Sequence, residues 1–212
     1  MKKLGIVVAT LVALTLPAQG GAMSFAATAL AAATLPLVIP GHPSVRPWPI
    51  GHGAAYRPPA AARVVRAGRP AGTLRCARGG ASFELHLELF AAQRVIVVPA
   101  GIGIATPMTR RGAAVVADGC TYPLWTLAPG GVIEVRGRRL DLADLFVVWG
   151  QALGSRRLAS FMSAAPLRAY VGGRRVHGPV GEIALASHEE IVLELGGYVA
   201  PHASFLFAGG GT

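Results

Sequence analysis

The stretch FELHLELF, residues 83–90, decides the fold, because its apolar and polar residues alternate without a break. Period-two alternation is typical of a β-strand with one face in the core. We therefore expect a strand that turns its leucines inward. Its other face, which carries Glu84, His86 and Glu88, is expected to be polar and solvated.

Further elements follow on both sides of one helix. Residues 141–150 (DLADLFVVWG) have apolar side chains at helical spacing, Asp141 with Asp144 as a capping box, and Gly150 as the stop. The expected strands are residues 95–98, 132–135, a Gly-Gly hairpin over 167–176, and 190–195. This order predicts an α+β domain of mostly antiparallel β-hairpins with one main helix, and a β-grasp-like arrangement is one candidate.

The N-terminus has the layout of a secretory signal. Lys2 and Lys3 precede an apolar run over residues 4–16, small residues follow at 18–22, and a second apolar stretch spans 23–39. Residues 1–39 are thus predicted to be a signal peptide, with an uncleaved signal-anchor as the alternative. The protein is expected to be exported to the periplasm, the cell surface or the medium, with an N-terminal membrane anchor left open.

Most of the net positive charge lies outside the predicted domain. The chain has a formal net charge of +10, and seven arginines but no acid lie between residues 41 and 80. The proline and arginine content predicts a disordered linker over 40–73, a folded domain over 74–208 and a flexible tail over 209–212. The linker is either a solvated spacer or a contact to an anionic membrane surface. No nucleic-acid partner is expected, because the eleven arginines of residues 81–212 are nearly balanced by ten acids and the excess charge is assigned to the N-terminus and the linker.

Two cysteines, Cys76 and Cys120, are the only thiols of the chain. In an oxidising compartment such a pair normally forms a disulfide. Redox catalysis is the alternative, but it generally requires a C-x-x-C spacing, which this chain lacks. We therefore expect a disulfide that pins the start of the domain.

The candidate metal ligands are Glu84, His86 and Glu88, which share one face of the first strand. Three donors on one strand do not complete a structural zinc site, which takes four ligands, and His177, His188 and His202 lie in unrelated segments. A solvated strand face without metal is therefore the simpler interpretation. No catalytic constellation or cofactor motif is present, so we expect a protein that is not an enzyme and uses no cofactor.

Six short motifs resemble those of a family of uncharacterised exported bacterial proteins. They are HLELF (86–90), VPAGIGI (98–104), CTYPLWT (120–126), GVIEV (131–135), FVVWGQ (146–151) and IVLELGGYVAPH (191–202). The resemblance covers residues 74–207 and implies one exported domain.

More distant members of that family are rich in histidine, which implies copper or zinc binding. The matching positions here hold Glu84 and His86, then residues 125–127 (WTL), and Glu134 where another histidine would be expected. Only His86 is retained, so the resemblance implies a scaffold that has lost this metal site.

Three functions stay open from the sequence. The first is a non-catalytic envelope domain that binds an unknown protein or envelope polymer. The second is a metal-binding protein that uses His86 with Glu84, Glu88 and a histidine brought in by folding. The third is an enzyme of a type that the sequence does not reveal.

Overall fold

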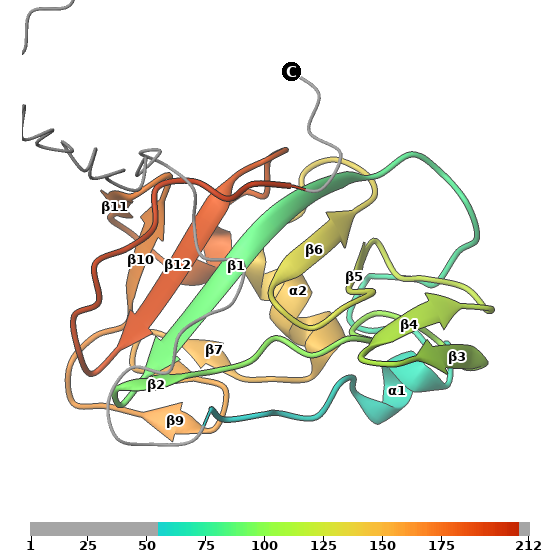
Figure 1. Ribbon diagram of the computed structural model, residues 1–212, viewed down its shortest axis with the longest axis horizontal. Coiled ribbons are helices and arrows are strands. Elements are labelled where there is room, and N and C mark those ends of the chain that lie inside the picture. Colours follow the sequence, from blue (N-terminus) through green and yellow to red (C-terminus); the bar gives the residue numbers. More distant parts are fainter. Residues whose placement is uncertain (1–54, 208–212) are drawn as a thin grey trace, which may run out of the picture. The chain divides into compact units, whose positions relative to one another are not determined.

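A mixed sheet forms the centre of the computed structural model, which describes residues 55–207 (Figure 1). Its strand order is β11-β10-β12-β1-β6-β5, and β2 pairs with β1 off this path. The strands of this sheet are β1 (Phe83–Ala91), β2 (Arg94–Val95), β5 (Leu124–Trp125), β6 (Val132–Val135), β10 (Arg168–Val171), β11 (Arg174–Val176) and β12 (Glu190–Leu195). The α+β class is confirmed, whereas the β-grasp-like arrangement stays a prediction.

The two longest strands, β1 and β12, lie side by side in the middle of the sheet and run parallel. Their register places His86 opposite Glu190 and Phe90 opposite Glu194. β6 and β10 flank this pair in antiparallel orientation. The central pair is thus an exception to the expected antiparallel hairpins, and it joins segments about a hundred residues apart in the sequence.

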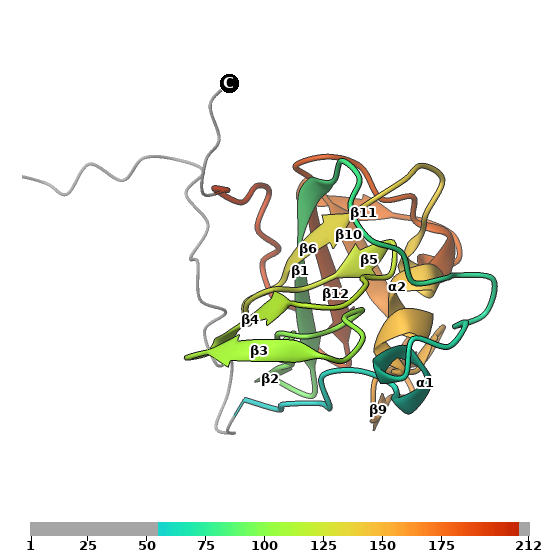
Figure 2. The same ribbon diagram turned by 90° about the vertical axis from the view of Figure 1, so that its right-hand side faces the viewer.

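Smaller elements surround the sheet. The hairpin of β3 (Met108–Arg111) and β4 (Ala114–Ala117) projects from one end of the domain (Figure 2). The remaining elements are α1 (Arg63–Arg66), the three-stranded meander of β7 (Leu153–Gly154), β8 (Arg157–Leu158) and β9 (Phe161–Met162), and the 3-10 turn η1 (Val180–Glu182). The sequence did not predict these elements.

Helix α2 (Leu142–Trp149) covers one face of the sheet. Both hydrogen bonds of the predicted capping box between Asp141 and Asp144 are present, and Gly150 ends the helix in the left-handed conformation. The buried side chains of α2 pack with the leucines of β1 and the apolar residues of β12 that point to the same side. This apolar layer fixes which side chains of the two strands face the other way.

The opposite face of the sheet lies beneath the C-terminal segment, residues 196–207. Figure 2 shows the sheet almost edge-on, with α2 on one side and this segment, in dark red, on the other. The segment contains no helix or strand. It covers the face that the sequence predicts to be solvated.

Residues 55–73, here called the N-terminal wrap, are part of the folded domain, so the prediction of a disordered linker is wrong for them. Val65 is fully buried, and the indole N–H of Trp149 donates to the carbonyl of Pro59 at 2.8 Å. The apolar residues between the prolines and arginines supply enough buried surface to order the wrap. The rest of the linker, the signal and residues 208–212 lie outside the described residues.

The disulfide between Cys76 and Cys120 is present and closes a loop with a sequence separation of 44. It joins the start of the domain to the segment before β5. A disulfide indicates an oxidising compartment, in agreement with export. Within residues 55–207, no helix combines the length and apolar character needed to cross a bilayer.

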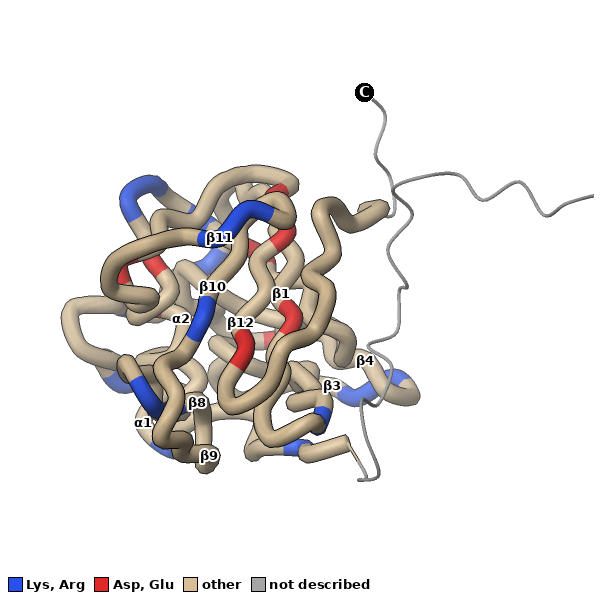
Figure 3. Tube along the Cα trace, turned by 90° about the vertical axis from the view of Figure 1, so that its left-hand side faces the viewer, with Lys and Arg blue, Asp and Glu red and all other residues tan. Residues whose placement is uncertain are grey.

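Because the N-terminal wrap is folded, its arginines belong to the surface of the domain, in contrast to the sequence interpretation. Only two acids, Asp118 and Glu182, are classed as exposed among the described residues. Figure 3 shows arginines over much of the domain and acids on β1 and β12. The exposed arginines are Arg57, Arg63, Arg66, Arg69, Arg75, Arg78, Arg94, Arg110, Arg111, Arg138, Arg139, Arg156, Arg157, Arg174 and Arg175.

Candidate metal centre

The polar face of β1 is buried, so the prediction of a solvated strand face is wrong. His86 is 0% exposed and Glu88 is 2% exposed, and Glu190 on the neighbouring strand β12 is 1% exposed. The alternation of β1 places His86 and Glu88 on the face away from α2, the pairing with β12 places Glu190 beside His86, and the C-terminal segment then covers them. Three ionisable side chains are thereby sealed inside the domain, which is costly unless they neutralise one another or hold a ligand.

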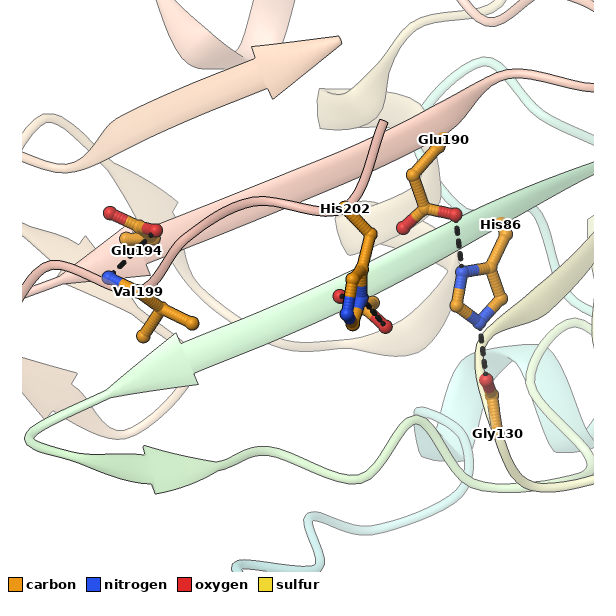
Figure 4. Close-up of polar contacts among 7 residues, drawn as sticks. His86, Gly130, Glu190, Glu194, Val199 and His202 are labelled. Atoms are coloured by element: carbon orange, nitrogen blue, oxygen red, sulfur yellow. Dashed lines mark hydrogen bonds and ion pairs between the residues drawn. The ribbon is translucent and has the colours of Figure 1, made fainter. Parts of the chain in front are cut away.

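Two hydrogen bonds fix the ring of His86. Its Nε2 lies 2.8 Å from the carbonyl oxygen of Gly130, and its Nδ1 lies 2.7 Å from Oε2 of Glu190 (Figure 4). A carbonyl oxygen only accepts, so Nε2 carries a proton. In the neutral ring Nδ1 then has a free lone pair directed at Glu190. Second-shell carbonyls hold metal-binding histidines in the same way.

The shared proton between His86 and Glu190 resides on the carboxyl group. Burial raises the pKa of Glu190 to about 9, with a further contribution from nearby Glu88. Burial also lowers the pKa of His86, against the opposing effect of the Gly130 hydrogen bond. At neutral pH the pair is therefore a carboxylic acid that donates to a neutral imidazole, without net charge.

The loop that supplies the Gly130 carbonyl needs glycine. Gly130 and Gly131 have φ angles of 126° and 95°, in the region that side chains disfavour. A Cβ atom on Gly131 would lie 2.3 Å from the carbonyl oxygen of Leu87 and 3.1 Å from Nε2 of His86. This close approach lets the loop reach the imidazole.

Glu88 is paired with a histidine from the C-terminal segment. Nδ1 of His202 lies 2.8 Å from Oε2 and 2.9 Å from Oε1 of Glu88. The side chain of His202 is 40% exposed, while that of Glu88 is 1% exposed. His202 thus lies beside the buried cluster and reaches solvent.

Ligand atoms from His86, Glu88 and Glu190 lie within 4.8 Å of one another. Oε1 of Glu190 is buried and has no hydrogen-bond partner among the described residues. In Figure 4 this oxygen points toward the side on which His202 lies. An orphaned buried carboxyl oxygen is costly, and a cation between the three groups would satisfy it.

Glu84 does not belong to the cluster, in contrast to the predicted ligand set. Glu84 lies opposite Glu134 in the register of β1 and β6. Burial raises the pKa of the Glu84 carboxyl, and the charge of nearby Glu134 raises it further. His177 and His188 are exposed and lie outside the three-residue group. The cluster therefore contains His86 and Glu88 of the predicted ligand set, lacks Glu84, and contains Glu190 in addition.

Glu190 was missed from the sequence, and His202 was only one of three histidines that folding could have brought to the site. The alternation of residues 190–195 was visible, but nothing in it shows that β12 pairs with β1 in the register that joins Glu190 to His86. His202 lies in a segment without regular structure, so no periodicity predicts its direction.

A second buried pair lies further along the same face. Glu194 accepts a hydrogen bond from the backbone N–H of Val199 at 3.1 Å and lies 3.3 Å from Arg168. Burial raises the pKa of Glu194, and the hydrogen bond from Val199 and the charge of Arg168 oppose this shift. Glu194 thus helps to hold the C-terminal segment on the sheet.

Comparisons of the chain with protein-family models, curated proteins and solved structures give no match.

Proposed function

We propose that this protein is an exported, non-catalytic domain that binds one divalent transition-metal ion through His86, Glu88 and Glu190. The observation that carries the proposal is the convergence of three sealed ligand groups around an orphaned oxygen of Glu190. The hydrogen bond from Nε2 of His86 to Gly130 also supports it, because the Nδ1 lone pair, which now accepts from Glu190, then points into the cluster.

The donor set favours zinc or copper. Imidazole suits both metals, whereas calcium and magnesium prefer sites made of oxygen ligands alone. On binding, the ion would replace the proton between His86 and Glu190, and the two carboxylates would balance its double charge. The C-terminal segment covers the site and keeps a substrate away from the ion, which favours a storage or carrier role over catalysis.

The test is metal titration of the purified chain, followed by native mass spectrometry and calorimetry with Zn²⁺ and Cu²⁺ separately. We expect one ion per chain, with binding lost in His86→Ala and weakened at least about tenfold in Glu190→Gln, because a ligand is removed in each. The matched controls are His177→Ala and Glu189→Gln, which make the same chemical changes outside the cluster. Equal binding by the site and control variants would refute the proposal.

A second candidate function is attachment to an anionic envelope polymer or membrane surface. The supporting observation is the excess of exposed arginines over exposed acids. Arg57 and Arg110 also line an open cavity of about 360 Å³ that no acidic residue lines. Arginine suits this role because its planar guanidinium binds phosphate and carboxylate groups in a bidentate manner.

Sedimentation with vesicles of anionic and of neutral lipids tests the second candidate. We expect binding to anionic vesicles that weakens with salt. The double variant Arg57→Glu/Arg110→Glu should bind less than the matched variant Arg174→Glu/Arg175→Glu, which changes the charge equally on the β10–β11 hairpin. No binding by the parent protein at low salt would exclude an anionic membrane as the partner.

A further inference from the structure

The C-terminal segment closes the candidate metal centre and places His202 next to Glu88. His86, Glu88 and Glu190 come from the central strands, while His202 comes from the C-terminal segment. The other face of β1 and β12 is filled by the apolar core against α2. An ion can therefore reach the three sealed side chains only after the C-terminal segment is displaced.

The segment is held on the sheet by contacts to the centre and by contacts beside it, among them the packing of Val199 on an apolar cluster and the contact of Arg168 with Tyr198. The ring of Phe205 stacks on the imidazole of His86 with centroids 3.7 Å apart and an angle of 13° between planes. His202 pairs with Glu88, and the backbone of Val199 bonds to Glu194. Because the segment has no regular structure, few backbone hydrogen bonds oppose its local opening.

His202 lies beside the three-residue group without belonging to it, so it would have to move to bind an ion held by that group. Nδ1 of His202 lies within 2.9 Å of both oxygens of Glu88, so an ion bound to Glu88 would lie close to this imidazole. To coordinate, Nδ1 would give up to solvent the proton that it now donates to Glu88. Two imidazoles and two carboxylates complete the four ligands of a closed zinc site.

We infer that residues 197–207 form a latch that opens to admit the ion and is locked over it by coordination of His202. This inference rests on the proposed metal function and adds the fourth ligand and its regulation. The latch couples metal occupancy to the position of the C-terminal end of the described chain. A metal-dependent change in the exposure of this segment is the signal that a partner could detect.

The experiment combines two readouts on the full chain with Co²⁺ and Zn²⁺ as probes. Co²⁺ absorption reports four-coordinate geometry, and amide hydrogen exchange reports opening of residues 197–207. We expect parent protein with Co²⁺ to show the intense visible bands of a tetrahedral site, and Zn²⁺ to slow exchange in the segment. In His202→Ala the ion should still bind, at least about tenfold more weakly, without tetrahedral bands or added protection.

His188→Ala is the matched control, because His188 contacts Phe207 of the segment and lies outside the three-residue cluster. It should keep the tetrahedral spectrum and the metal-dependent protection. If the parent protein binds no metal, the proposed function fails and the latch with it. If the parent protein binds metal but His202→Ala gives the same spectrum, affinity and exchange, the latch is wrong and the three-ligand site stands.

Discussion

Replacement of Glu190 by glutamine should flatten the pH dependence of stability above neutral pH in the metal-free protein. The folded pair of His86 and Glu190 holds one transferable proton, because burial raises the pKa of the carboxyl to about 9 and lowers that of the imidazole. In the unfolded chain the two groups return to pKa values of 4.5 and 6.5. The two states therefore bind different numbers of protons between pH 6.5 and about 9 and again below pH 4.5.

This difference in bound protons decides whether the free energy of unfolding rises or falls with pH. Between pH 6.5 and about 9 the folded pair keeps a proton that the unfolded pair has released, so the free energy of unfolding falls as pH rises. The slope is about 1.4 kcal/mol per pH unit, which gives a loss of about 3 kcal/mol over this interval. Below pH 4.5 the unfolded pair binds the additional proton and stability falls toward acid, so the contribution is greatest between these limits.

The assay is urea unfolding in the presence of a chelator across this pH range. In Glu190→Gln the amide N–H replaces the carboxyl O–H as donor to Nδ1 of His86, and no carboxyl titrates. We expect the variant to show little change in the free energy of unfolding above pH 6.5, while Glu189→Gln keeps the slope of the parent protein. A parent protein without this slope, or a Glu190→Gln variant with the full slope, would refute the proton assignment.

Three further substitutions, each followed by equilibrium unfolding, test the contacts that stabilise the fold around the site. Trp149→Phe removes the indole hydrogen bond to the N-terminal wrap and should cost about 2 kcal/mol, and an unchanged stability would mean that this bond contributes nothing. Replacing Cys76 and Cys120 by serine should cost about 4 kcal/mol, from the loop entropy restored to the unfolded chain, and a loss below about 1 kcal/mol would contradict this origin. Gly131→Ala should cost roughly 3 kcal/mol, because its Cβ would collide with a backbone oxygen of β1, and Gly137→Ala, with open space at its Cβ, should cost less.

The sequence was sufficient for the elements that local chemistry determines. The strand over residues 83–90, the capped helix over 142–149 and the Gly-Gly hairpin are set by side-chain period, a capping box and left-handed glycines. The disulfide followed from cysteine count and compartment. Each of these signals lies within a short stretch of chain or in its composition.

The burial of the polar strand face could not be predicted in this way. Alternation separates two faces of a strand, but it does not say whether another segment covers the second face. The cover here is an irregular segment near the end of the chain, and Glu190 reaches His86 only through a parallel pairing of distant strands. The N-terminal wrap was missed because its apolar residues are spaced irregularly between prolines and arginines.

The central claim is that His86, Glu88 and Glu190 bind one metal ion. The most direct measurement is anomalous X-ray scattering from crystals of the zinc-loaded protein, recorded on both sides of the zinc absorption edge. We predict one strong peak about 2.0–2.2 Å from Nδ1 of His86 and from a carboxylate oxygen of Glu88 and of Glu190. A zinc peak elsewhere, or an intact hydrogen bond between His86 and Glu190 at saturating zinc, would contradict the claim.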